Sequence, residues 1–118
     1  MVKETVTMYR PCNEAEYRLV EASEFKAWPP RLEGQPIFYP VANLEYAREV
    51  NAWNVSDSGR GYVLKFEVDS EWARKYPLQV VGAARHEEWW IPAEDLASLN
   101  DHIIGLIELV EVQTRKTS

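Results

Sequence analysis

The stretch "RHEEWWIPAEDL" (85–96) places His86, Glu87 and Glu88 directly before an aromatic, strand-like run. Acidic residues are depleted in strands, so carboxylates at this point need an explanation. A carboxylate at the entrance of a hydrophobic strand is either an ordinary edge charge or a catalytic group held by a rigid scaffold. The chemistry it would perform depends on which side chains share its face.

Strand alternation decides which of these side chains lie together. Successive side chains of a strand point to opposite faces, so His86 and Glu88 share a face with the indole of Trp90. A carboxylate beside an aromatic wall is suited to meeting a cationic ligand. The opposite face is predicted to carry Glu87, Trp89 and Ile91.

Two further side chains, Arg10 in "MYRP" and Tyr39 in "FYP", stand at strand ends or beside strand-breaking prolines. Each also has an ordinary interpretation. An arginine at a strand end is usually solvated or in a surface ion pair, and a tyrosine in an aromatic strand is usually in the core with its hydroxyl bonded. Likewise, Glu88 is usually a surface charge and His86 a surface or satisfied histidine. None of the four is specific alone.

Composition bounds the class of protein. A chain of 118 residues, 46% hydrophobic and 27% charged, is ordinary for one globular domain, so residues 1–118 are expected to form a single domain. The net charge of -6 favours solubility and argues against broad contact with nucleic acid or an anionic membrane. It leaves room for a local basic pocket that takes one phosphorylated ligand.

The sequence predicts a cytoplasmic protein without a membrane span or a metal site. The segment "MVKETVTMYR" has no apolar signal core. The most apolar run, "HIIGLIELVEV", is interrupted by Glu108 and Glu111. Cys12 is the only cysteine, so no intrachain disulfide is possible, which fits a reducing compartment. Two histidines and one cysteine far apart in sequence do not predict a metal site.

Two of the helices expected to position these residues are each preceded by an asparagine that can cap the helix. Asn13, with Glu16 three residues later, forms a variant of the capping box and predicts a helix to about Ala22. Asn43 predicts a second helix over 44–54. Two more short helices are expected over 71–76, with Ser70 as the cap, and over 92–103, and "SDSGRG" (56–61) is expected to be a loop.

Alternation is clearest in the strand 62–69, where the larger apolar side chains fall on one face. Pro11 is expected to end the first strand. The predicted strands are 5–10, 25–28, 37–41, 62–69, 78–82, 87–91 and 106–112. Regular alternation of strand and helix stops after the second helix, so the order predicts an α+β fold with a mixed or antiparallel sheet and short helices.

Three of these segments resemble motifs of the ADP-ribosyltransferases. "HEEWWIP" is similar to their E-x-E segment, in which the second Glu is catalytic and a hydrophobic strand follows. "MYRP" resembles their first-strand Tyr-Arg motif, and "IFYP" stands where they carry either Ser-Thr-Ser or a tyrosine. The resemblance implies an ADP-ribosyltransferase-like fold.

The whole chain further resembles a group of small bacterial proteins labelled "ADP-ribosylation/crystallin J1". That group shares the patterns Tyr-Arg-Pro, Pro-Pro-Arg, Phe-Tyr-Pro and His-x-Glu-x-Trp-x-Pro. The chain departs from the transferase pattern because it lacks Ser-Thr-Ser and has His86 at the first position of E-x-E. These departures leave open a different acceptor or a domain that has lost activity.

The resemblance implies NAD as the substrate, with ADP-ribose passed to an unidentified acceptor, which could be a protein or, less in keeping with the net charge, a nucleic acid. It also gives each residue a role. Breaking the nicotinamide–ribose bond develops oxocarbenium character on the sugar, as in glycoside chemistry. Glu88 would hold the ribose hydroxyls and stabilise that charge, and His86 would position the acceptor or a hydroxyl. Arg10 would hold the pyrophosphate, and Tyr39 would stack on the nicotinamide. Arg31, after two prolines, would be a second phosphate contact, although a solvated loop arginine is its ordinary interpretation.

Two other classes of function remain open. The first is a non-catalytic nucleotide- or protein-binding module, such as an inactive relative or an immunity-type protein, that uses an aromatic groove. It is suggested by five tryptophans that cannot all lie deep in so small a core and that are favoured at interfaces: Trp28, Trp53, Trp72, Trp89 and Trp90. The second is a nucleotide-binding domain that cleaves a different N-glycosidic or phosphate bond, because sites and not folds decide function.

Overall fold

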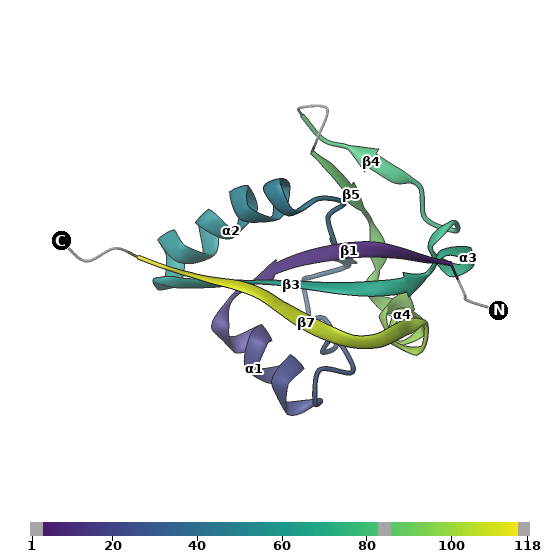
Figure 1. The fold of residues 1–118 in the computed structure, drawn as a ribbon, viewed down its shortest axis with the longest axis horizontal. Helices are drawn as coiled ribbons and strands as arrows, with labels where there is room; N and C mark the ends of the chain where they lie inside the picture. Colours follow the sequence, from purple (N-terminus) through teal and green to yellow (C-terminus); the bar gives the residue numbers. More distant parts are fainter. Residues whose placement is uncertain (1–3, 83–85, 116–118) are drawn as a thin grey trace.

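Three long strands run side by side through the middle of the molecule (Figure 1). β1 (Thr5–Cys12) and β7 (Ile103–Thr114) flank β3 (Arg60–Asp69), and both are antiparallel to it. The computed structural model describes residues 4–82 and 86–115. Within them the architecture is a mixed α+β fold with antiparallel sheets and short helices, as the sequence predicts.

The remaining elements are short and surround this sheet. They are α1 (Glu14–Ala22), β2 (Ile37–Phe38), α2 (Leu44–Ser58), α3 (Ser70–Ala73), β4 (Leu78–Val80), β5 (Glu87–Trp89), β6 (Ile91–Pro92), a 3-10 turn η1 (Ala93–Asp95) and α4 (Leu96–Asp101). β2 pairs with β6, and β4 pairs with β5, in both cases antiparallel.

One extended segment connects β1 to β5 and so widens the sheet. Val41 exchanges two backbone hydrogen bonds with Tyr9 of β1, at 2.8 and 2.9 Å. On its other side, Trp89 of β5 donates its backbone N–H to the carbonyl of Pro40 at 2.9 Å. Neighbouring strands lie about 4.8 Å apart. The ends of β1, the 40–42 segment and β5 are therefore close neighbours, although they are far apart in sequence.

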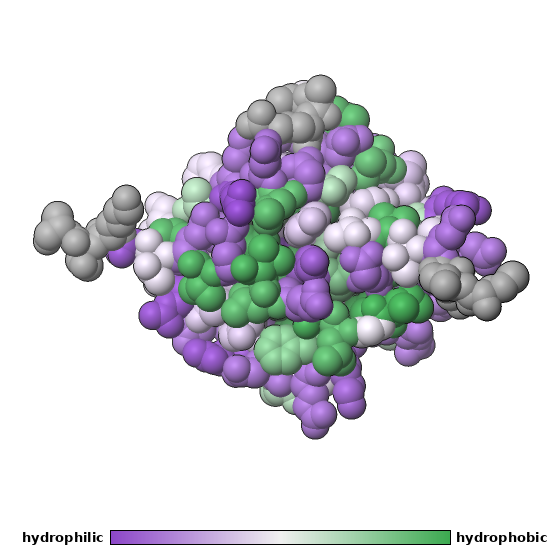
Figure 2. Space-filling view, viewed as in Figure 1, coloured by the Kyte–Doolittle hydropathy of each residue, from purple (hydrophilic) through white to green (hydrophobic). Residues whose placement is uncertain are grey.

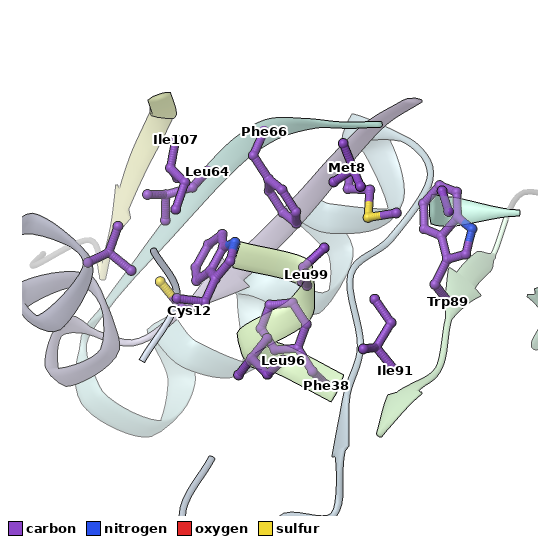
Figure 3. Packing of buried hydrophobic residues seen from close by; sticks show 14 of the residues in the cluster. Met8, Cys12, Phe38, Leu64, Phe66, Trp89, Ile91, Leu96, Leu99 and Ile107 are labelled. Carbon is purple, nitrogen blue, oxygen red and sulfur yellow. The ribbon is translucent and has the colours of Figure 1, made fainter. Parts of the chain in front are cut away.

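The core lies on the face of β3 that the alternation predicts. Tyr62, Leu64, Phe66 and Val68 are all buried on that face. Side chains from α1, from α4 and from the segment around β2 cover them, including Phe38, Leu96 and Leu99 in Figure 3. The opposite face of the sheet packs on α2, where Val63 and Val41 contact Ala47.

Both asparagine caps are confirmed. The Asn13 side chain accepts from the backbone N–H of Glu16 at 2.9 Å, and α1 ends at Ala22. The Asn43 side chain accepts from the backbone N–H of Tyr46 at 2.7 Å. The predicted loop over 56–61 is wrong at both ends, because α2 continues to Ser58 and β3 begins at Arg60. Only Gly59, a left-handed cap with φ 87°, lies between them.

The predicted end of the first strand at Pro11 is also wrong, since β1 continues to Cys12. Tyr9 uses its backbone N–H toward Val41, on the side away from β3. Pro11 is two residues further, so its ring nitrogen faces that same side. A proline is tolerated where the missing N–H does not belong to the ladder, and β1 loses no bond to β3 there.

The predicted strand over 25–28 is absent. Glu24 and Phe25 have left-handed φ values of 62° and 61°, which no strand accommodates. The Ser23 hydroxyl bonds the backbone on both sides of this turn, donating to the carbonyl of Val20 at 2.6 Å and accepting from the N–H of Ala27 at 3.2 Å. Such local side-chain bonds compete with a sheet ladder.

Other helices and strands begin or end at different residues than predicted, because their pairing and packing with neighbouring elements determine where they end. The run 87–91 is divided between β5 and β6, which pair with different strands. The third helix is capped by Asp69 rather than Ser70 and ends at Ala73. The predicted helix over 92–103 shortens to η1 and α4, the strand 78–82 shortens to β4, and the strand 106–112 lengthens to β7. No helix within 4–82 and 86–115 is both long and apolar enough to cross a bilayer.

Tyr76 makes the stability of the fold depend on pH in the alkaline range. Its hydroxyl donates to Asp95 Oδ2 at 2.7 Å, and its ring packs on Trp72. Burial, followed by the bond to Asp95, raises the pKa of Tyr76 to about 12, against about 10 for an unfolded tyrosine. Because the folded state binds this proton more tightly, its contribution to stability is complete below pH ~10 and is lost as the pH rises toward the folded pKa.

We therefore expect the urea midpoint of unfolding to fall between about pH 10 and pH 12, and to fall less in Tyr76→Phe. A tyrosine absorbance titration of the folded protein would report the raised pKa directly. An identical alkaline loss in the variant would assign the effect to other groups.

Candidate functional site

Arg10, Tyr39 and Glu88 line one groove with a volume of about 460 Å³. Arg10 lies in β1, Tyr39 directly precedes the 40–42 segment, and Glu88 lies in β5. The backbone pairing of these three segments places their side chains next to one another. Pro11, Val41, Tyr46, Val50 and Trp90 complete the groove lining.

The Glu88 carboxylate is held by two donors in this groove. Trp90 Nε1 donates to Oε1 at 2.8 Å, and the Tyr46 hydroxyl donates to Oε2 at 3.2 Å. The predicted division of faces is confirmed, because Glu88 and Trp90 meet while Trp89 and Ile91 are buried. Glu88 is thus a fixed carboxylate with aromatic side chains around it, and it is suited to stabilising a positive charge.

His86 lies beside the groove but is not among its lining residues. Its ring stacks on Tyr46 with centroids 4.5 Å apart, and its Nε2 lies 2.6 Å from Glu49 Oε2. The contact with Tyr46 connects His86 to the residue that bonds Glu88. His86 therefore supports Tyr46 from behind and does not line the groove.

Tyr46 is a site residue that the sequence analysis did not identify. It stands in the first turn of α2, four residues before Val50, so both side chains lie on the helix face that borders the groove. Burial, followed by the charge of Glu88, raises the pKa of the Tyr46 hydroxyl. The hydroxyl therefore remains a donor to the carboxylate at neutral pH. The i, i+4 spacing was the available signal, but only the fold shows which face meets β5.

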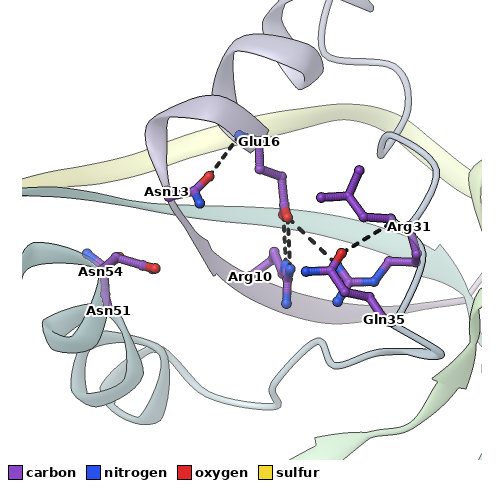
Figure 4. Close-up of polar contacts among 8 residues, drawn as sticks. Arg10, Asn13, Glu16, Arg31, Gln35, Asn51 and Asn54 are labelled. Atoms are coloured by element: carbon purple, nitrogen blue, oxygen red, sulfur yellow. Dashed lines mark hydrogen bonds and ion pairs between the residues drawn. The ribbon is translucent and has the colours of Figure 1, made fainter. Parts of the chain in front are cut away.

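Arg10 reaches the groove while its charge is balanced by Glu16 (Figure 4). Nε and Nη2 of Arg10 donate to the two oxygens of Glu16 at 2.8 and 2.9 Å. Burial opposes the charge, but Glu16 outweighs it and raises the pKa of Arg10. The guanidinium also lies over the ring of Phe38, 4.8 Å from its centroid. A ligand oxygen would therefore contact Nη1 or displace Glu16.

Arg31 is not brought into the groove. Its Nη1 lies 3.8 Å from Glu16 Oε1, and its guanidinium lies 5.7 Å from the Phe38 centroid. It lines a smaller pocket between α1 and the segment that follows Pro29 and Pro30. The arginine is largely buried, so it is not the solvated loop residue of the ordinary interpretation.

A larger hollow of about 670 Å³ lies elsewhere, between Leu44 at the start of α2 and the middle of β7. Its lining is apolar apart from Tyr9 and from Lys65 and Glu108, which pair with each other at 3.5 Å. Figure 2 shows apolar side chains gathered among polar ones on the face of the molecule that β7 crosses. Within the described part of the chain, the one acid of this hollow is paired with its one lysine and Tyr9 is its other polar residue, so the groove is the stronger candidate for a chemical site.

The tryptophans divide as expected between core and surface. Trp28, Trp72 and Trp89 are buried, whereas Trp53 is 77% exposed and Trp90 45% exposed. Trp53 follows Val50 by one helical turn, so it continues the face of α2 that borders the groove. An exposed indole therefore stands on the same side of α2 as the groove-lining residues Tyr46 and Val50, although it does not line the groove itself.

No protein-family model matches the chain, and neither a curated protein nor a solved structure is detectably similar to it. The class of the molecule is thus defined by its own features, a mixed α+β fold whose extended sheet carries a groove with a fixed carboxylate, an arginine and aromatic walls.

Proposed function

We propose that the groove binds NAD or a related nucleotide, and that the domain is an ADP-ribosyltransferase-like enzyme that passes ADP-ribose to an acceptor. One observation carries the proposal: the three residues singled out by the motif resemblance, Arg10, Tyr39 and Glu88, line the same groove. They come from segments that are distant in sequence. A groove of about 460 Å³ also has the size of a small-molecule site.

The proposed chemistry uses the carboxylate at the sugar. As the bond between the ribose carbon and the nicotinamide nitrogen breaks, the electron pair leaves with nicotinamide and positive charge develops on the ribose. Glu88, oriented by Tyr46 and Trp90, stabilises that charge. The acceptor then bonds to the ribose carbon and releases its proton to the carboxylate or to water. Water itself is the simplest acceptor, and with it the reaction releases ADP-ribose.

The binding step is tested by thermal unfolding of the purified protein across NAD and ADP-ribose concentrations up to millimolar. A ligand at ~100 times its dissociation constant adds about 2.7 kcal/mol, which is several degrees for a domain of this size. We expect a saturable rise with both nucleotides. No shift with either nucleotide would contradict a nucleotide groove.

The same titration on Tyr39→Ala locates the ligand. Tyr39 is exposed, so its removal should leave the fold intact, and loss of one stacking platform should weaken nucleotide binding about tenfold. Trp53→Ala is the matched control, since it removes an exposed aromatic ring outside the groove lining. Equal affinity in the wild type and in Tyr39→Ala would place the nucleotide elsewhere.

A second candidate function is a non-catalytic protein-binding module, and the exposed Trp53 on the same side of α2 as the groove favours it. Indoles are enriched among the residues that carry binding energy at interfaces. Under this alternative, Trp53→Ala abolishes a protein complex, whereas Glu88→Gln changes neither binding nor any turnover of NAD. The two candidate functions therefore give opposite results with the same pair of variants.

A further inference from the structure

Two arginines share a single carboxylate next to the groove. Glu16 accepts from Arg10 through both of its oxygens, and Arg31 Nη1 lies 3.8 Å from Oε1 (Figure 4). The side chains of Arg10, Arg31 and Glu16 are 14%, 12% and 17% exposed, respectively. Two largely buried positive charges thus meet one negative charge, so the cluster carries an excess of one positive charge.

The neighbouring acids of α1 are engaged elsewhere. Glu14 and Glu21 both pair with Arg18, and Glu14 also reaches Arg60. Burial, followed by the charge of Arg10, lowers the pKa of Arg31. The charge of Arg31 is therefore held in a place where the protein compensates it only in part.

Arg31 also has an unused donor. Its Nε is buried and has no hydrogen-bond partner within the described part of the chain. Buried polar groups nearly always have a partner, from the protein, from water or from a ligand. Nε itself has almost no accessible surface, so an oxygen anion would bond the Nη atoms of the same guanidinium, whose nearest contact with Glu16 is 3.8 Å long, and such a bond would be charge-assisted.

The space for such a group is present. Arg31 lines a pocket of about 130 Å³ together with Ala15 of α1, Pro30 and Gln35, and the Glu16 carboxylate, which is bonded to Arg10, also borders it. This is room on the order of four water molecules, enough for one phosphate group and too little for a nucleotide. The first turn of α1 borders the pocket, and the positive end of a helix favours an anion. Pro29 and Pro30 stiffen the opposite wall.

We propose that this pocket is a separate binding site for a single phosphate group, with Arg31 as its principal donor. The site is distinct from the groove and does not depend on the nucleotide proposed there. Free phosphate and the phosphate of a larger ligand offer the same chemistry. Arg10 contacts the same carboxylate and also lines the groove, so one ligand long enough could use both places.

The test measures phosphate binding by thermal unfolding and calorimetry, with sodium chloride at equal ionic strength as the reference. Inorganic phosphate should raise the melting temperature of the wild type by several degrees in a saturable way. Arg31→Met keeps the packing on Phe38 but removes the charge, and its phosphate affinity should fall at least tenfold. Arg18→Met removes an exposed arginine of α1 and should respond as the wild type does.

The melting temperature without phosphate separates a binding role from a structural one. Arg31→Met should melt at or above the wild-type temperature, because it removes a buried charge that is only partly compensated. A large loss of stability in this variant, together with an unchanged phosphate response, would make Arg31 a structural residue and overturn the site. No saturable phosphate effect in the wild type beyond that of chloride would overturn it as well.

ADP-ribose distinguishes the source of the phosphate. Competition between ADP-ribose and inorganic phosphate that Arg31→Met abolishes would assign the pocket to a phosphate of the groove ligand, whereas simultaneous binding would assign it to free phosphate. Both results support the phosphate site. Competition that persists unchanged in Arg31→Met would place the phosphate at Arg10 in the groove and overturn the pocket. A phosphate effect without any effect of NAD or ADP-ribose would retain the pocket and reject the proposed function of the groove, so the two proposals fail separately.

Discussion

Replacing Glu88 by glutamine is expected to abolish the release of nicotinamide from NAD while NAD binding and the fold persist. Glutamine preserves the shape of the side chain and an oxygen that can accept from Trp90 or Tyr46. It removes the negative charge that would stabilise the oxocarbenium-like ribose. Loss of one such electrostatic contact lowers turnover by about 10²–10³-fold. Single-turnover assays of nicotinamide release, run beside thermal unfolding with NAD, measure both effects.

Glu87→Gln is the matched control for this experiment. Glu87 is the adjacent residue in β5 and undergoes the same chemical change, but it is not among the groove-lining residues. Its turnover should equal that of the wild type. Unchanged turnover in Glu88→Gln would remove Glu88 from the mechanism, and equal losses in both variants would indicate a structural disturbance of β5.

Trp28→Ala is expected to cause the largest loss of stability, about 3–5 kcal/mol in the free energy of unfolding. The ring of Trp28 packs between Phe38 and Phe66, with centroids 5.5 and 5.1 Å away. Its backbone is tied to α4, because it donates to Asn100 Oδ1 at 2.8 Å and accepts from Asn100 Nδ2 at 3.0 Å. The cavity would therefore open where three parts of the fold meet. Urea unfolding followed by circular dichroism measures the change.

Trp28→Phe should cost less than Trp28→Ala, about 1–3 kcal/mol, because it leaves a smaller cavity. The indole Nε1 of Trp28 is buried and has no hydrogen-bond partner in the described structure, so phenylalanine removes an unsatisfied donor along with some apolar area. Trp72→Phe is the comparison, because Trp72 Nε1 donates to Ser98 Oγ at 2.9 Å and that bond would be lost. A greater loss in Trp28→Phe than in Trp72→Phe would contradict this assignment.

Features governed by local rules were predictable from the sequence. The caps at Asn13 and Asn43 depend on a side chain and a backbone N–H three residues away. The alternation of β3 depends only on the pleat of the strand. For the same reason, the sequence alone predicts that Glu88 and Trp90 lie on one face of the strand and Trp89 on the other, whichever strands it pairs with.

Features governed by pairing were not predictable. No local rule shows that Val41 bridges β1 and β5, yet this bridge brings Arg10, Tyr39 and Glu88 to one groove. The sequence therefore predicts which residue types form the candidate site, but it does not predict that these residues lie in the same groove. The pairing of Arg10 with Glu16 was hidden for a different reason, because Glu16 was expected to serve only as part of a helix cap.

The central position of β3 also governs how the chain can fold as it is synthesised. β3 pairs with β1 upstream, but its other edge waits for β7, whose Thr114 lies opposite Arg60. Until the ribosome has made that segment, the edge of β3 that faces β7 stays open, and open edges invite pairing with other chains. Closing a pairing so distant in sequence is also slow. Completion of the sheet, and with it burial of Ile107 in the core, therefore has to await the synthesis of β7.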